Sequence, residues 1–230
     1  MELNQIQQFN FSLHELSVDL QEVEELAGID ASMPSYATFL KDEIDNHLAH
    51  SEIKGGYIIK SADLKKEAIK LEKQVFNTGL HIANKFKGSS HIAVFACTAG
   101  CQISDRINEL NAQAMLIESY LLDVLGSIMV EKAMDKIQDL LENQCYSHGL
   151  GITNRYSPGY INWHMAEQKA LFEILPKQFC GIKLSDSCLM MPVKSISGFI
   201  GIGKNVRFQK HECQSCNSQN CLYRHSKNHC

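Results

Sequence analysis

Apolar positions along the chain follow helical spacing in five stretches and form short continuous runs in between. Helical spacing places apolar residues on one face of a helix, so each such stretch predicts an amphipathic helix. Ser61 can cap one of these helices, and a break near Gly126 is expected in the longest. The predicted helices are Asp19–Leu26, Tyr36–His50, Ser61 to about Lys85, Ser104 to about Asn143, and Trp163–Leu175, which ends at Pro176.

Short apolar runs predict strands, because a run of four to eight apolar residues suits a buried strand. The predicted strands are Gly56–Lys60, His91–Cys97, Cys188–Met191 and Ser195–Ile202, and Gln144–Tyr160 is expected to be a glycine-bearing loop. Helices and strands are interspersed without regular strand–helix–strand alternation, which favours an α+β fold. No apolar run approaches the length of about 18 residues that a membrane-spanning helix needs.

Composition narrows the class of protein. The chain has 230 residues, of which 44% are hydrophobic and 21% charged, so a disordered, coiled-coil or collagen-like chain is excluded. The net charge of −4 does not indicate a nucleic-acid binder. The first residues lack a basic stretch followed by an apolar run, so no export signal is expected and the predicted location is the cytoplasm.

Charge divides the chain unevenly. Residues 1–50 are strongly acidic, and residues 204–230 are basic and rich in histidine. Two solvated surfaces of opposite sign would account for this division. Alternatively, the basic tail docks on an acidic partner or on phosphate.

Nine cysteines in a chain without an export signal favour buried, metal-bound or redox-active thiols over disulfides. Cys213, Cys216 and Cys221 have a spacing that lets thiolates meet one metal, either zinc or an iron–sulfur cluster. Cys188 is the predicted fourth ligand, and the alternatives are Cys230, His211 and His225. Free thiols in the tail would be the simpler interpretation. For Cys97 and Cys101, buried small residues compete with a second metal site or a redox pair.

Most familiar catalytic signatures are absent, including the phosphate loop, the nucleophile elbow and the HExxH zinc motif. The most informative segment is Arg155–Tyr160, RYSPGY, where Pro158 and Gly159 predict a tight turn. Such a turn would present Arg155 to a carboxylate and Tyr160 to a base or a cation. S-adenosylmethionine contains all three groups. A purely structural turn fits the same residues.

The turn and the segments around it resemble the activation domain of cobalamin-dependent methionine synthase. The resemblance covers about residues 91–203. It combines the RxxPGY turn with a later segment, GIKLSDSCLMMPVKSISGFIG, and an upstream strand, turn and long helix. The matching positions of the later segment are Gly181, Leu184, Ser187, Met190 or Met191, Pro192, Ser195, Ser197 and Gly198. A tyrosine that the family carries after this segment has no clear match, and Phe208 is the nearest aromatic residue.

The resemblance implies an α+β fold with a twisted antiparallel sheet and long helices. It also implies an accessory protein that binds S-adenosylmethionine and supports reductive methylation of inactive cobalt. The cobalamin would belong to a separate methionine synthase or related corrinoid methyltransferase, and a flavodoxin-like or ferredoxin-like donor would supply the electron. The implied organisation is a mostly helical segment (1–90), an activation-domain-like core (91–203) and a cysteine- and histidine-rich tail (204–230).

Five site residues follow from the resemblance. Arg155 would hold the ligand carboxylate, and Ser157 and Gly159 would supply backbone contacts. Tyr160 would line the adenine or sulfonium side. Glu131 would bind the amino group, with Glu118 as the rival candidate. Two other functions remain open: a non-enzymatic adaptor that binds a metal or an iron–sulfur cluster and docks on a corrinoid protein, and a thiol-based redox protein.

Overall fold

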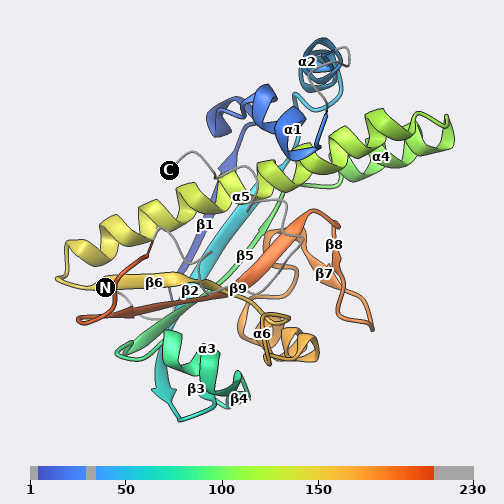
Figure 1. Cartoon of the computed structure of the whole chain (residues 1–230). Helices are drawn as coiled ribbons and strands as arrows, with labels where there is room; N and C mark the ends of the chain where they lie inside the picture. Colours follow the sequence, from blue (N-terminus) through green and yellow to red (C-terminus); the bar gives the residue numbers. More distant parts are fainter. Residues whose placement is uncertain (1–4, 30–34, 210–230) are drawn as a thin grey trace.

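The computed structural model describes residues 5–29 and 35–209, and its centre is a mixed-length antiparallel sheet (Figure 1). Within these residues the sheet has seven strands in the order β4-β3-β2-β5-β9-β6, and β1 pairs with the first half of β2. Every pairing is antiparallel, so the α+β prediction is confirmed. The strands are β1 (Ile6–Phe11), β2 (Ile53–Leu64), β3 (Ile69–Leu71), β4 (Gln74–Phe76), β5 (His91–Thr98), β6 (Gly151–Tyr156) and β9 (Ser195–Gly203).

The central strands are apolar on both faces, and each face supports its own hydrophobic core. Ala93, Phe95 and Cys97 of β5 lie in one buried cluster, whereas Ile92 and Val94 lie in the other. This division follows from the two-residue period of a strand, which sends successive side chains to opposite faces.

The helices are α1 (Leu20–Leu26), α2 (Ala37–Asn46), α3 (Gly79–Lys85), α4 (Gln102–Ala112), α5 (Leu116–Tyr146) and α6 (Gln168–Ile174), with single 3-10 turns at His14–Leu16, Met165–Glu167 and Phe179–Gly181.

The long helix α5 covers one face of the sheet, and α3 and α6 lie on the other (Figure 1). Its buried residues include Leu121, Leu125 and Met129, which recur every four positions and pack on the sheet. The predicted break near Gly126 is wrong, because α5 runs through this glycine. The interruption falls instead between α4 and α5, where Ala114 takes a left-handed conformation with φ of 60°. None of the helices in the described part of the chain is long and apolar enough to cross a membrane.

The helix predicted from Ser61 to Lys85 is wrong for most of its length. Strand β2 continues to Leu64, and a β3–β4 hairpin follows before the short helix α3. Residues 1–90 therefore contribute four strands as well as helices, which corrects the expectation of a mostly helical segment. Because β2 lies beside β5, residues on both sides of the predicted boundary at 90 belong to one sheet.

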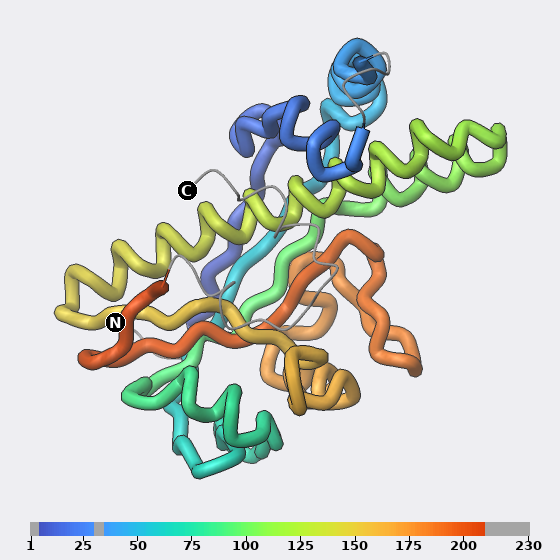
Figure 2. Tube along the Cα trace, viewed as in Figure 1, coloured from blue at the N-terminus to red at the C-terminus, as the bar shows by residue number. Residues whose placement is uncertain are grey.

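The described part of the C-terminal half contains two strands that the sequence did not predict, β6 and the two-residue strand β7. The expected loop Gln144–Tyr160 holds the end of α5 and the edge strand β6, which pairs with β9 (Figure 2). The helix expected at Trp163–Leu175 begins later, as a 3-10 turn followed by α6. Between α6 and β9 the chain forms a separate small hairpin of β7 (Lys183–Leu184) and β8 (Met190–Met191).

Candidate functional site

Arg155 reaches the α5 side of the sheet because of an irregularity in β6. Ile152 pairs with Ile202 and Arg155 with Ile200, so the register shifts between Ile152 and Arg155. Such bulges re-aim the side chains of an edge strand. Ile200 belongs to the core beneath α5, and Arg155, directly opposite it, points to the same face.

The Arg155 guanidinium meets two carboxylates from successive turns of α5. Its Nη2 donates to Oε2 of Glu131 at 3.1 Å and to Oδ1 of Asp135 at 2.8 Å. Glu131 and Asp135 are four residues apart, which places them on one face of the helix. The other terminal nitrogen, Nη1, is buried and has no hydrogen-bond partner among the described residues. A buried donor without an acceptor costs about 1–3 kcal/mol, so this atom favours the arrival of an anionic oxygen.

The environment of Glu131 shifts its protonation equilibrium. Partial burial raises the pKa of the Glu131 carboxyl, and the charge of Asp135 acts in the same direction. The Arg155 guanidinium lowers that pKa but does not cancel the rise. Glu131 would therefore be stabilised as a carboxylate by a second cation.

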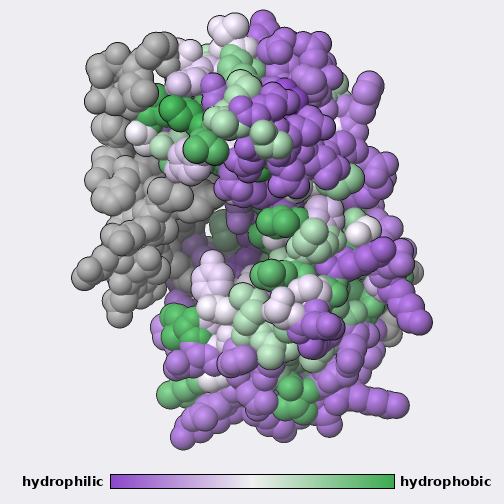
Figure 3. Space-filling model, turned by 90° about the vertical axis from the view of Figure 1, so that its right-hand side faces the viewer, coloured by the Kyte–Doolittle hydropathy of each residue, from purple (hydrophilic) through white to green (hydrophobic). Residues whose placement is uncertain are grey.

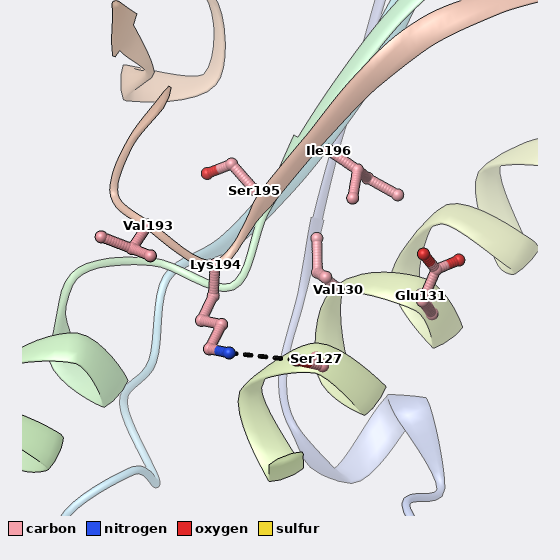
Figure 4. A pocket seen from close by; sticks show the side chains of 7 residues that line it. All are labelled: Ser127, Val130, Glu131, Val193, Lys194, Ser195 and Ile196. Atoms are coloured by element: carbon pink, nitrogen blue, oxygen red, sulfur yellow. Dashed lines mark hydrogen bonds between the residues drawn. The ribbon is translucent and has the colours of Figure 1, made fainter. Parts of the chain in front are cut away.

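A cleft of about 280 Å³ opens beside Glu131, between α5 and the start of β9 (Figure 4). At its other end lies the ammonium group of Lys194, which contacts Oδ1 of Asp123 at 2.8 Å and Oγ of Ser127 at 3.1 Å. The cleft thus has a carboxylate and an ammonium group at different places on its wall. Its lining residues are Ser127, Val130, Glu131, Val193, Lys194, Ser195 and Ile196.

Gly198 of β9 allows the end of β6 to approach closely. A Cβ atom at Gly198 would lie 2.4 Å from the carbonyl oxygen of Tyr156 and 2.8 Å from Oγ of Ser157. Gly198 pairs with Phe95, whose ring faces the α5 core, so Ser157 lies on the same side of the sheet as Arg155. The strand pairing therefore brings Ser157 and Arg155 to one face.

The predicted tight turn is present directly after β6. Tyr160 N–H donates to the carbonyl of Ser157 at 3.1 Å, and Gly159 N–H donates to the carbonyl of Trp163 at 2.7 Å. Gly159 has a φ of 101°, a conformation that suits glycine. Trp163 is buried and its indole N–H donates to Glu167 at 2.9 Å, which anchors the turn on the other core. Tyr160 is 55% exposed at the surface.

The structure brings some predicted site residues together and separates others. Arg155 and Glu131 are in direct contact, Ser157 is on their side of the sheet, and Gly159 and Tyr160 form the adjoining turn. Glu118, the rival of Glu131, is in the first turn of α5, more than three turns away.

The predicted metal ligands lie mostly outside the described residues. Cys213, Cys216 and Cys221 belong to residues 210–230, and only Cys188 is described, as a buried free thiol in the β7–β8 hairpin. Within residues 5–29 and 35–209 no group of three or more histidine, cysteine or acidic side chains is arranged to hold a metal.

Cys97 and Cys101 are both free thiols, the first buried and the second exposed. Burial raises the pKa of Cys97 well above its ordinary value. A redox pair requires a readily formed thiolate, and Cys97 has the opposite character. This environment agrees with a buried small residue at Cys97, whereas the expectation of burial is wrong for Cys101, which is exposed.

Sequence reasoning missed Asp135, Lys194 and the packing role of Gly126. Asp135 could have been found from its spacing to Glu131 on a predicted helix. Lys194 lies across Gly126, where an added Cβ would come within 2.9 Å of the lysine Cγ. No local pattern indicates this contact, because it joins a helix to a strand far along the chain.

The fold and the site define a class of protein: an α+β domain with an arginine–carboxylate pair beside an open cleft. The sequence of residues 37–227 matches the family described as "Vitamin B12 dependent methionine synthase, activation domain". This match covers more than half of the chain, and the chain therefore belongs to that family. It also extends well beyond residues 91–203, to which the resemblance was assigned.

A solved structure shares the fold. A crystal structure described as the MetH reactivation domain bound to AdoHcy superposes with a TM-score of 0.65 at 14% sequence identity. The likeness covers 90% of this chain and 81% of that chain. A search of curated proteins found no match.

Proposed function

We propose that this chain binds S-adenosylmethionine at the Arg155–Glu131 pair and supports reductive methylation of a corrinoid. The observation that carries the proposal is the contact of Arg155 Nη2 with the Glu131 carboxylate, together with a buried Nη1 on the same guanidinium that has no partner among the described residues. Membership of the activation-domain family and the AdoHcy-bound state of the similar structure support it.

The pair suits the head group of an α-amino acid. A zwitterionic head group carries a carboxylate and an ammonium on one carbon, so its receptor needs a cation and an anion side by side. Arg155 Nη1 would donate a hydrogen bond to the ligand carboxylate, and Glu131 would accept one from the ammonium group. A second cation near Glu131 would also offset the rise in its pKa that burial causes.

The remaining site residues would hold the nucleoside end of the ligand. Ser157 and Gly159 offer backbone groups of the turn, and Tyr160 offers an exposed ring for the adenine or the sulfonium. The fixed turn would supply these contacts without reordering when the ligand arrives.

The chemistry needs positioning more than acid–base groups. Bound S-adenosylmethionine would supply an electrophilic methyl group on sulfur. An external donor reduces Co(II) to Co(I) in the corrinoid partner. Co(I) then forms the bond to the methyl carbon, while the carbon–sulfur bond breaks and its electron pair stays on sulfur. No proton moves, so the domain's part is to hold the methyl group in line and to exclude water.

The corrinoid partner would approach the face beside the β7–β8 hairpin. Leu189, Met191 and Val193 are 65%, 52% and 60% exposed, and Val193 also lines the cleft. Figure 3 views the molecule from this side and shows apolar residues gathered around a hollow. An apolar rim next to the ligand cleft suits a partner that must close over the reacting groups.

Methylcobalamin formation tests this function. The chain would be mixed with a Co(II) methionine synthase fragment that lacks its own activation domain, a low-potential reductant such as reduced flavodoxin, and S-adenosylmethionine. We expect the absorbance of methylcobalamin to appear, and to appear much more slowly with Arg155→Ala. An equal rate without the chain would contradict the proposal. The same assay tests action in trans, which stays a prediction. A cytoplasmic location also stays a prediction.

The cysteine tail remains a separate proposal: Cys213, Cys216, Cys221 and Cys188 would bind zinc or an iron–sulfur cluster. A cluster would provide an entry point for the electron that reduces cobalt. Metal and sulfide analysis of anaerobically purified protein tests it, with Cys213→Ser/Cys216→Ser as the comparison. Protein without bound metal would contradict the proposal, and zinc without sulfide would exclude the electron relay.

A further inference from the structure

The Arg155 guanidinium binds two carboxylates at once, and these two contacts fix its orientation. Both contacts use the same nitrogen, Nη2, which has two N–H groups. With Glu131 on one side and Asp135 on the other, the plane of the guanidinium is fixed by two acceptors. Nη1, at the other corner of the fork, is buried and unpartnered.

Glu131, too, contacts the described part of the chain through one side-chain oxygen only. Its contact to Arg155 uses Oε2 at 3.1 Å, the longer of the two contacts to Nη2. Arginine and a carboxylate usually prefer two parallel hydrogen bonds, which would occupy both oxygens of Glu131. The shorter contact, to Asp135 at 2.8 Å, competes with that arrangement.

We propose that Asp135 is a positioning residue that prevents Arg155 and Glu131 from closing on each other, so that both stay available to the head group of S-adenosylmethionine. This inference rests on the proposed function. Without Asp135, the guanidinium turns toward Glu131 and pairs with both of its oxygens. The ligand then has to break this pair before its carboxylate and ammonium groups can bind.

A purely structural role for Asp135 makes a different prediction. Its side chain is 62% exposed, and an exposed ion pair contributes at most about 1 kcal/mol to stability. Alanine is also a better helix former than aspartate, so Asp135→Ala should fold and unfold much like the original protein. If Asp135 only tethered α5 to β6, Asp135→Ala would lower the stability of the fold and would weaken the binding of all ligands equally. A positioning role affects only ligands that carry the amino-acid head group.

Calorimetry with two ligands separates these cases. S-adenosylmethionine carries the head group, and 5′-methylthioadenosine has the nucleoside without it. Asp139→Ala is the matched control, because Asp139 is an exposed aspartate one turn further along α5. We expect Asp135→Ala to bind S-adenosylmethionine roughly tenfold more weakly, which corresponds to about 1.4 kcal/mol. Its affinity for 5′-methylthioadenosine and its melting temperature should match those of Asp139→Ala.

Two results would overturn the inference: equal affinity of Asp135→Ala and Asp139→Ala for S-adenosylmethionine, or a parallel loss for both ligands. The same titrations show separately whether the proposed function fails. Unaltered protein that does not bind S-adenosylmethionine contradicts the function itself. Unaltered protein that binds, together with an unaffected Asp135→Ala, contradicts only the role of Asp135.

Discussion

Single residues set how closely the strands of the site approach each other. Gly198 faces the carbonyl of Tyr156 and the hydroxyl of Ser157 at distances that leave no room for a methyl group. Backbone atoms of a paired strand cannot move aside as the end of a flexible side chain can. The position therefore requires glycine for packing, although its φ is not in the left-handed region.

Gly198→Ala should destabilise the fold and displace the end of β6. Overpacking of this kind costs about 1–3 kcal/mol, which lowers the melting temperature by several degrees for a chain of this size. Thermal unfolding followed by circular dichroism measures the change. An unchanged melting temperature would show that β6 and β9 are further apart than described.

Glu131 should lower the free energy of unfolding as the pH rises, even though we propose that it binds the ligand. Burial raises its pKa, so the folded state holds the proton more tightly than the unfolded state does. The resulting stability is present below the ordinary glutamate pKa and is lost as the pH rises through the higher folded pKa. Relative to Glu131→Gln, the original protein should thus lose unfolding free energy as the pH rises above the ordinary glutamate pKa of about 4.

Urea unfolding at several pH values checks this prediction. Glu118→Gln is the control, because it removes a glutamate from the same helix far from Arg155. If the original protein instead gained stability over Glu131→Gln as the pH rose, the ion pair with Arg155 would outweigh the cost of burial.

A local sequence pattern identifies the candidate residues at the end of β6 and in the turn after it, and their role in binding stays a prediction. Arg155 lies in β6, whereas Ser157, Gly159 and Tyr160 form the turn that follows, and the Pro-Gly pair makes this bend recognisable. Glu131 was assigned by resemblance and is in contact with Arg155 as a binding pair requires. Asp135 was missed because its role depends on a contact between a helix and a strand.

At the scale of elements, prediction succeeded where the hydrophobic pattern has one period and failed where a pattern is interrupted. The continuous apolar run of β5 predicted a buried strand almost residue for residue. In β6, a register shift between Ile152 and Arg155 breaks the alternation, and the segment was predicted as a loop. The β3–β4 hairpin was predicted as helix because its strands have only three residues each.

The attachment of α2 to α4 depends on a buried ion pair. Glu43 is 2% exposed, and Arg106 binds both of its carboxylate oxygens, at 2.8 and 2.7 Å. Removing the arginine leaves a buried carboxylate without its partner, which costs about 3–5 kcal/mol. We expect Arg106→Ala to lower the unfolding free energy by about 3 kcal/mol in urea denaturation.

Glu109→Ala provides the matched control for that prediction. It removes the exposed contact of Arg106 at 2.9 Å and leaves the buried one intact. Its expected cost is below about 1 kcal/mol. Similar losses for the two variants would mean that the pair between α2 and α4 does not hold them together.

At the scale of the whole molecule, the two faces of the sheet have different roles. The face beneath α5 presents Arg155, Ser157 and the cleft, whereas the opposite face anchors the turn through Trp163 and its core. The α+β class was predictable because helices and strands are interspersed, but the pairing of β2 with β5 was not. That pairing joins segments that local sequence patterns assign to separate domains.

The measurement that tests the central claim most directly is calorimetric titration with S-adenosylmethionine of the original protein, Arg155→Ala and Arg207→Ala. Arg207 is an exposed arginine and serves as the control for loss of one positive charge. Hydrogen bonds to charged groups contribute about 1.5–3 kcal/mol, so Arg155→Ala should bind roughly 10- to 100-fold more weakly while Arg207→Ala is unaffected. Equal binding by all three proteins would contradict the account.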